Sequence, residues 1–109
     1  MNLKLFIPAA ILAVAIGFAQ GGAAQAAQTI DISAQNFMFS PATITVKAGA
    51  TVTWVNRDQE PHTIFNDAGL FRSSALDTND KFSYTFDKPG TYHYVCTIHP
   101  RMTGTIIVE

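Results

Sequence analysis

The chain has 109 residues, of which 48% are hydrophobic and 14% charged, and its formal net charge at pH 7 is −1. A nearly neutral balance leaves no basic surface of the kind that binds nucleic acid, so we expect no nucleic-acid partner. The single cysteine also excludes an intramolecular disulfide, which leaves a bound metal as the means of stabilising a small domain.

The N-terminal segment, residues 1–26, has the pattern of a secretory signal peptide. Lys4 supplies a basic start, an apolar run follows from Leu5 to Phe18, and the small-residue motif Ala24-Gln25-Ala26 ends the segment. The run is shorter than the ~20 apolar residues that a membrane-spanning helix needs. We therefore predict a cleavable signal peptide, a periplasmic protein and no integral membrane anchor after cleavage.

Residues 27–109 are predicted to form one domain, which we expect to be a monomer. Without Lys4 this domain keeps six Lys and Arg residues (7 − 1) against eight Asp and Glu residues. No internal repeat, low-complexity tract or linker divides it, so the domain is predicted to be one compact unit.

Hydrophobic and polar residues alternate in short stretches along the domain. A period of two is typical of half-buried strands. The alternation occurs in residues 43–49, 51–56, 81–86, 90–96 and 104–109, with a further strand near 62–65. Turn residues separate these stretches, so we predict an all-β, antiparallel sandwich or barrel. The polar segment 66–80 is expected to be a loop or to hold one helical turn.

The segment CTIHPRMTG, residues 96–104, holds three soft potential metal ligands. Cys96 shares one face of the predicted strand 90–96 with two tyrosines, which indicates that this face points to the core. A buried cysteine can be simply a small hydrophobic residue. His99 favours a ligand instead, because a tight loop after the strand turns its imidazole back toward the thiol, and Met102 lies one step further round.

The fourth candidate ligand is His62, which precedes Cys96 by 34 positions (96 − 62) at the start of another predicted strand. A sandwich can bring two such strand ends together. His93 has the opposite strand parity to Cys96, so we expect it to face away from the core and not to bind metal.

One thiolate, two imidazoles and one thioether indicate copper. Two His and one Cys with a weak axial Met describe an electron-transfer copper site. Structural zinc would more often use a second cysteine or histidine in place of the methionine. We therefore predict one type 1 copper ion per chain, bound by His62, Cys96, His99 and Met102.

Three stretches resemble the cupredoxins, which are small type 1 blue copper proteins, and among them amicyanin first, then plastocyanin and pseudoazurin. They are FSPATITVKAGATVTWVNRD, the PH pair at 61–62, and KPGTYHYVCTIHPRMTGTIIVE. The C-x-x-H-x-x-M loop is similar to the short form found in amicyanins. The resemblance implies a Greek-key β-sandwich, with His62, Cys96 and His99 as equatorial ligands and Met102 as the axial ligand.

Two positions differ from the family pattern. Many members carry an Asn after the first His ligand, where it helps to pin the Cys loop, and this chain has Thr63. Amicyanins have an aromatic residue after the loop proline, and this chain has Arg101. We expect the first change to affect loop rigidity and reduction potential, and the second to alter the docking surface, so that the amicyanin partner, an amine dehydrogenase, is not assumed.

The predicted function is electron transfer between redox protein partners, in which copper cycles between Cu(II) and Cu(I). The exposed edge of His99 is the expected electron port. The alternative is an exported copper chaperone or copper storage protein, which would need an open, methionine-rich site. We do not expect an enzyme, because four protein ligands leave no open copper position.

Overall fold

The computed structural model describes residues 27–109. The predicted signal peptide, residues 1–26, lies outside these described residues. Between 27 and 109 there is no helix with the length and apolar character needed to cross a membrane.

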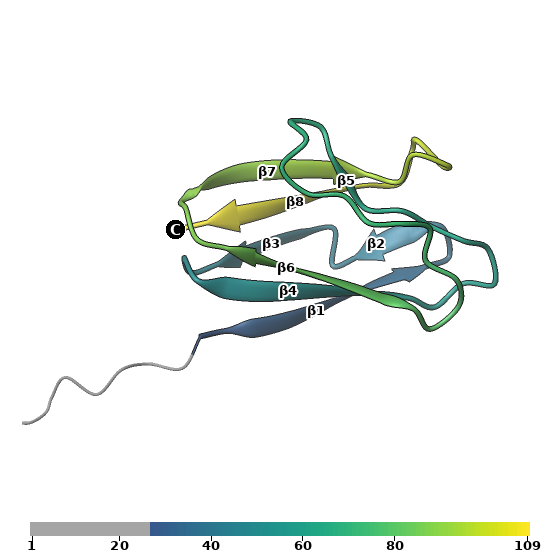
Figure 1. Cartoon of the computed structure of the whole chain (residues 1–109), viewed down its shortest axis with the longest axis horizontal. Helices are drawn as coiled ribbons and strands as arrows, with labels where there is room; N and C mark the ends of the chain where they lie inside the picture. Colours follow the sequence, from purple (N-terminus) through teal and green to yellow (C-terminus); the bar gives the residue numbers. More distant parts are fainter. Residues whose placement is uncertain (1–26) are drawn as a thin grey trace, which may run out of the picture.

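Within residues 27–109 the chain forms eight strands in two four-stranded sheets, which pack face to face (Figure 1). The first sheet contains, in spatial order, β2 (Met38–Ser40), β1 (Thr29–Gln35), β4 (Ala50–Asn56) and β6 (Lys81–Phe86). The second contains β3 (Thr43–Val46), β8 (Thr103–Val108), β7 (Gly90–Val95) and β5 (Phe65–Asn66). The prediction of an all-β sandwich is confirmed.

The predicted strands correspond to β3, β4, β6, β7 and β8, whereas β1 and β2 are additional to them. The strand expected near 62–65 is the two-residue β5. The segment 67–80 contains no helical turn. It is a loop held by two isolated bridges, His62 to Leu76 and Phe65 to Arg72.

The sheets are mixed, so the prediction of a purely antiparallel arrangement is wrong. β1 pairs in parallel with β4, and β3 pairs in parallel with β8, while the other pairs are antiparallel. After β2 the chain crosses to the second sheet for β3 and returns for β4, which therefore runs in the direction of β1. Alternation has a period of two in both parallel and antiparallel strands, and it carries no information on direction.

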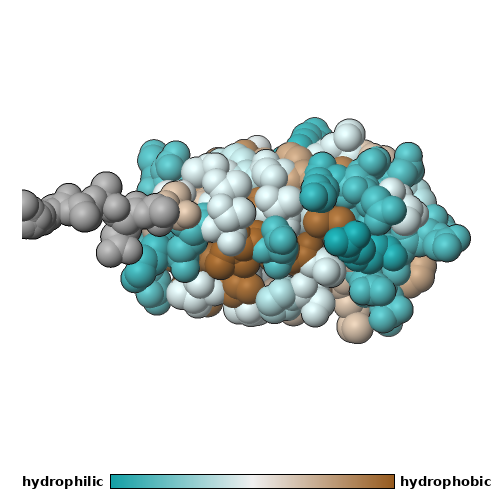
Figure 2. Space-filling model, turned by 90° about the horizontal axis from the view of Figure 1, so that it is seen from below, coloured by the Kyte–Doolittle hydropathy of each residue, from teal (hydrophilic) through white to brown (hydrophobic). Residues whose placement is uncertain are grey.

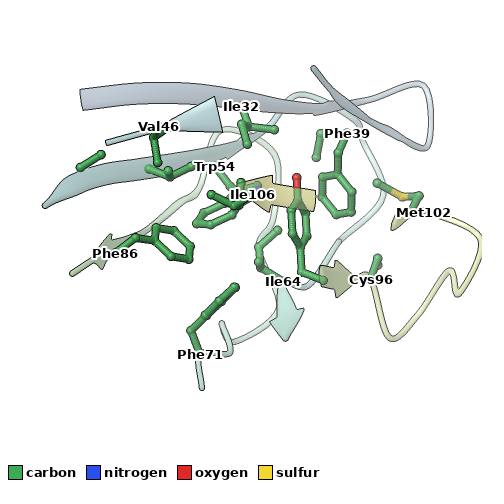
Figure 3. Close-up of a cluster of buried hydrophobic side chains, with 14 of the residues drawn as sticks. Ile32, Phe39, Val46, Trp54, Ile64, Phe71, Phe86, Cys96, Met102 and Ile106 are labelled. Carbon is green, nitrogen blue, oxygen red and sulfur yellow. The ribbon is translucent and has the colours of Figure 1, made fainter. Parts of the chain in front are cut away.

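The core lies between the sheets and is built by the inward positions of the alternating strands. In β4, Val52 and Trp54 are fully buried, and Trp54 packs against aromatic rings from both sheets. Figure 3 shows the core along its length, with Cys96 and Met102 at one end and Val46 and Phe86 toward the other. Two of the candidate ligands, Cys96 and Met102, therefore lie at one end of the hydrophobic core.

Polar and apolar residues share the outer surface. Figure 2 shows mostly hydrophilic residues on the visible face, with hydrophobic residues exposed near its centre. The turn between β1 and β2, the loop after β4 and the loop between β7 and β8 meet at the end of the sandwich opposite the C-terminus (Figure 1). These three connections build the candidate site.

Candidate metal centre

Cys96 follows the last residue of β7 and places its thiol between two imidazoles. Its Sγ lies 3.8 Å from Nδ1 of His62 and 3.7 Å from Nδ1 of His99. One nitrogen or sulfur atom of each of these three residues lies within 4.8 Å of the others. Cys96 and His62 are both 0% exposed, whereas His99 is half-buried. The structure thus brings together three of the four predicted ligands around one point.

The loop from Cys96 to Met102 closes on itself through three backbone hydrogen bonds. The N–H of His99 donates to the Cys96 carbonyl (3.2 Å), and the N–H of Met102 donates to the His99 carbonyl (2.9 Å). The N–H of Cys96 donates to the Met102 carbonyl (3.0 Å). Met102 is therefore returned to the start of the loop, where its side chain is buried close to Cys96 (Figure 3).

Thr63 ties the Cys96 loop to the strand region that carries His62. Its N–H lies 3.4 Å from Cys96 Sγ, and its hydroxyl lies 3.9 Å from the same sulfur. The hydroxyl also accepts the N–H of Thr97 at 2.8 Å and shares a 2.8 Å hydrogen bond with the Thr97 hydroxyl. Thr63 and Thr97 therefore connect the Cys96 loop to the segment that carries His62.

The thiol of Cys96 is set to ionise easily. Burial alone would raise its pKa, but the Thr63 N–H, the adjacent imidazoles of His99 and His62, and the Ile98 N–H outweigh this and lower the pKa to about 6. A thiolate is the form of cysteine that binds metal. The surroundings therefore favour the ligand form of Cys96 over an inert buried thiol.

Asp58, which the sequence patterns do not single out, fixes the other side of His62. Its Oδ2 lies 2.7 Å from His62 Nε2. Although burial alone would raise the pKa of Asp58, hydrogen bonds from the Phe37 N–H, His62 and the Asn36 N–H hold it below its usual value. An acid four positions before a candidate metal-binding histidine is the one signal in the sequence that could have indicated this contact.

The turn between β1 and β2 places an aromatic ring beside the two histidines. Gln35 pairs with Met38, so Asn36 and Phe37 form a two-residue turn, with φ values of 55° and 57°. The left-handed region costs a residue with a side chain roughly 1–2 kcal/mol. Asparagine tolerates it, but a phenylalanine at the second position has no such preference. The Phe37 ring lies edge-on to His62 and to His99, with ring centres 5.5 and 4.9 Å apart.

Apolar residues surround the exposed part of His99. Phe37 and Ile98, which line one hollow with His99, are 46% and 47% exposed. Met38, 60% exposed, lines a neighbouring hollow with Phe37 and Arg101. A surface hollow of about 400 Å³ is lined by Phe37, Ile98, His99, Pro100, Arg101 and Met102. Arg101 is exposed and brings the one positive charge of this lining.

His93, predicted not to bind metal, lies outside the group formed by His62, Cys96 and His99. It is exposed, and its Nδ1 lies 3.1 Å from the Thr105 hydroxyl. The outward parity expected for His93 is confirmed.

Comparison with known proteins places this arrangement in a family. Residues 8–108 match the model of the cupredoxin-like domain. The chain is 37% identical to amicyanin from Paracoccus denitrificans over 97 residues, which cover 84% of this chain and 72% of that protein. It is 40% identical to plastocyanin from Scenedesmus fuscus over 85 residues, covering 66% of this chain and 87% of that protein.

Solved structures agree with the sequence matches. A Cu(I) form of an amicyanin variant superposes with a TM-score of 0.72 at 33% identity, covering 78% of this chain and 86% of that chain. A purple cupredoxin from Nitrosopumilus maritimus gives a TM-score of 0.68 at 32% identity, covering 73% and 99% of the two chains. The expected resemblance and the cupredoxin-like Greek-key sandwich are confirmed.

Proposed function

Because the chain belongs to the cupredoxin-like domain family, we propose that it is a type 1 copper protein that transfers electrons between redox protein partners. The predicted cofactor, one type 1 copper ion, is confirmed by the family and by the grouped donors. We propose His62, Cys96 and His99 as the principal ligands, and Met102 as the weak axial ligand.

The observation that carries the proposal is the thiol of Cys96 held between two imidazole Nδ1 atoms in a buried pocket. This donor set fits copper in both oxidation states, because thiolate and thioether suit Cu(I) and imidazole suits Cu(II) as well. The bound copper would supply a one-electron step between Cu(II) and Cu(I). The buried residues around Cys96 keep the donors in place and exclude water.

His99 is the proposed route for electrons to the surface. Among the three grouped donors it alone is partly exposed, since His62 and Cys96 are fully buried. The apolar residues that line the same hollow, Phe37 and Ile98, offer a surface from which water is easily displaced when a partner docks. A redox protein that brings its own cofactor against this surface would approach the site through the His99 edge.

Burial argues against the alternative of copper delivery or storage. A protein that hands on its metal needs donors that partners can reach, but Cys96, His62 and Met102 are at most 2% exposed. A copper-containing nitrite reductase from Thermus scotoductus is similar at 28% identity and a TM-score of 0.71. The match covers 84% of this chain but only 25% of that enzyme, so we propose no enzymatic activity here.

We further propose that the protein is exported to the periplasm, that residues 1–26 are removed as a signal peptide, and that residues 27–109 act as a monomer. The basic start, short apolar run and Ala-Gln-Ala motif support this. The N-terminal sequence of the protein recovered from the periplasm should begin at Ala27. A chain that starts at Met1 in that fraction would contradict cleavage.

The experiment that tests the function is the visible spectrum of the purified protein after addition of Cu(II). We expect one copper ion per chain and an intense blue colour that bleaches with ascorbate. Cys96→Ser should abolish the colour, because a hydroxyl is a poor ligand for copper. His93→Ala is the matched control and should keep both colour and copper content. A blue Cys96→Ser protein would show that the ligand assignment is wrong.

A further inference from the structure

We propose that Asp58 is a positioning residue of the metal centre, which ties the imidazole of His62 to the β1–β2 turn and holds the Phe37 ring against both histidines. The proposal rests on the copper site proposed above. It assigns a role to two residues, Asp58 and Phe37, that are not themselves ligands.

One carboxylate joins three parts of the site. Oδ1 of Asp58 accepts the N–H of Asn36 at 2.7 Å, and Oδ2 accepts the N–H of Phe37 at 3.0 Å. The same Oδ2 lies 2.7 Å from Nε2 of His62. Asp58 thus connects a predicted ligand to a turn that is 21 to 22 residues away along the chain.

Asp58 is itself held in place from both sides of its backbone. Its N–H donates to Oδ1 of the buried Asn56 at 2.8 Å, and its carbonyl accepts the hydroxyl of Thr78 at 2.6 Å. The Asn56 amide in turn donates to the carbonyls of Glu60 and Leu76, each at 2.8 Å. The Asp58 carboxylate is therefore fixed in position, and its hydrogen bond to Nε2 sets the position of the His62 imidazole.

The contact also determines which nitrogen of His62 can bind metal. Nδ1 faces Cys96 Sγ at 3.8 Å, and Nε2 faces the carboxylate. A carboxylate accepts a hydrogen bond, so the proton resides on Nε2 and the lone pair of Nδ1 is left toward Cys96. A carboxylate on the far nitrogen makes the imidazole a stronger donor, which favours the more highly charged Cu(II) over Cu(I).

Phe37 belongs to the same group of contacts because it lies in the turn that Asp58 holds. Its φ of 57° is a conformation that glycine adopts freely and phenylalanine avoids, and its N–H is fixed by Asp58. Its ring is nearly perpendicular to those of His62 and His99, at 86° and 77°. A strained residue beside a site suggests a functional reason for the strain. Here the half-exposed Phe37 ring packs against both imidazoles, of which that of His62 is fully buried.

The first test compares Asp58→Asn with Glu60→Gln. Both changes remove one negative charge from the same loop, but the Glu60 side chain is exposed and makes no hydrogen bond to His62 among the described contacts. In Asp58→Asn the imidazole becomes a weaker donor, so the preference for Cu(II) should fall about tenfold, which raises the reduction potential by about 59 mV for one electron. Glu60→Gln should raise the reduction potential by less than half as much. Equal shifts in the two variants would overturn the role of Asp58.

The second test uses Phe37→Gly. Glycine relieves the strain at φ 57° but loses the contacts of a half-exposed ring, so the copper-free variant should lose less stability than Phe37→Ala, which loses the same contacts and keeps the strain. Without the Phe37 ring against the histidines, the reduced copper protein should lose its metal at least several-fold faster to the Cu(I) chelator bathocuproine disulfonate. Asp58→Asn should also accelerate the loss, and it should add little in the Phe37→Gly background, because both changes release the same ring. Unchanged removal rates in Phe37→Gly, or fully additive effects, would overturn the coupling.

A measurement on the unchanged protein does not depend on the variants folding. In the Cu(I) form, which is diamagnetic, the Nε2 proton of His62 should give a resolved, slowly exchanging NMR signal because it is buried and hydrogen-bonded. A His62 that is protonated on Nδ1, or an Nε2 proton that exchanges at the rate of a solvent-exposed imidazole, would overturn the proposal. If the protein binds no copper, the proposed function fails, whereas the unfolding of copper-free Phe37→Gly still reports on the strained turn.

Discussion

At the scale of single residues, Tyr94 is a buried polar group that the site does not use. It is 2% exposed, and its hydroxyl has no hydrogen-bond partner in the part of the chain that the structure describes. Burial raises the pKa of Tyr94 to about 12. The neutral phenol is therefore favoured in the folded protein.

This shift predicts a dependence of stability on pH. The folded pKa of about 12 exceeds the usual tyrosine value of 10.0, so the stabilisation is complete below pH 10 and is lost as pH rises toward 12. In Tyr94→Phe this loss should be absent, a difference of roughly 2–3 kcal/mol in the free energy of unfolding across that window. At neutral pH the change should be almost neutral, since no hydrogen bond is removed.

Urea denaturation of the copper-free proteins between about pH 9 and pH 12 provides the measurement. Tyr84→Phe is the control, because the Tyr84 ring is only partly buried, and this variant should lose stability with pH as the unchanged protein does. A Tyr94→Phe protein with the same pH dependence as the unchanged protein would contradict the prediction.

At the scale of elements, the pairing of β7 with β8 depends on a glycine. Gly104 lies directly opposite Tyr94, and a Cβ atom at Gly104 would overlap the Tyr94 ring. Because Tyr94 is buried, its ring has little room to move away. A side chain at Gly104 would therefore strain the pairing of the two strands that carry the loop from Cys96 to Met102.

We therefore expect Gly104→Ala to destabilise the copper-free protein by about 1–3 kcal/mol, the range found for overpacked cores. Thr103→Ala, at the exposed neighbouring position of β8, should have a much smaller effect. Equilibrium denaturation in urea measures both. If Gly104→Ala were as stable as the unchanged protein, β7 and β8 could accommodate the added methyl group without a loss of free energy of unfolding.

At the scale of the whole molecule, the chain carries little net charge, so a single charge at the docking end can dominate recognition. Arg101 is exposed and lines the hollow beside His99. A partner that docks there meets one cation within an apolar surface. Electrostatic attraction of this kind increases association rates and is screened by salt.

Arg101→Glu should therefore change rates without changing the site. With copper bound, its oxidation by the anion ferricyanide should slow by about threefold to tenfold at low ionic strength, and the difference should shrink as salt is added. The blue spectrum should stay the same, because Arg101 is not among the proposed ligands. Stopped-flow kinetics measures the rates.

The control for Arg101→Glu is Lys88→Glu, an equal change of charge beside the start of β7, at the other end of that strand from Cys96. Its oxidation rate should stay close to that of the unchanged protein. If the two variants were slowed equally, net charge and not the position of Arg101 would control the encounter.

The sequence alone was enough to indicate six of the eight strands, β5 with shifted bounds, and the candidate ligands. Alternation is a local property, since each strand needs only its own residues to present one apolar face, and this holds for β4 and β7. The spacing of Cys96, His99 and Met102 is local as well, because one short loop carries all three. His62 is inferred from its place at the start of another predicted strand, because a sandwich can bring two strand ends together.

The direction of pairing and the surroundings of the ligands were decided by tertiary structure. β1 beside β4, Thr63 beside Thr97, and Asp58 beside the Asn36–Phe37 turn all join residues far apart along the chain. No sequence pattern singles out Phe37, whose backbone is left-handed and whose N–H is bound by the distant carboxylate of Asp58. The local pattern of a strand specifies which of its residues face inward. Contacts between distant segments depend on how the whole core packs, and no single stretch of sequence contains that information.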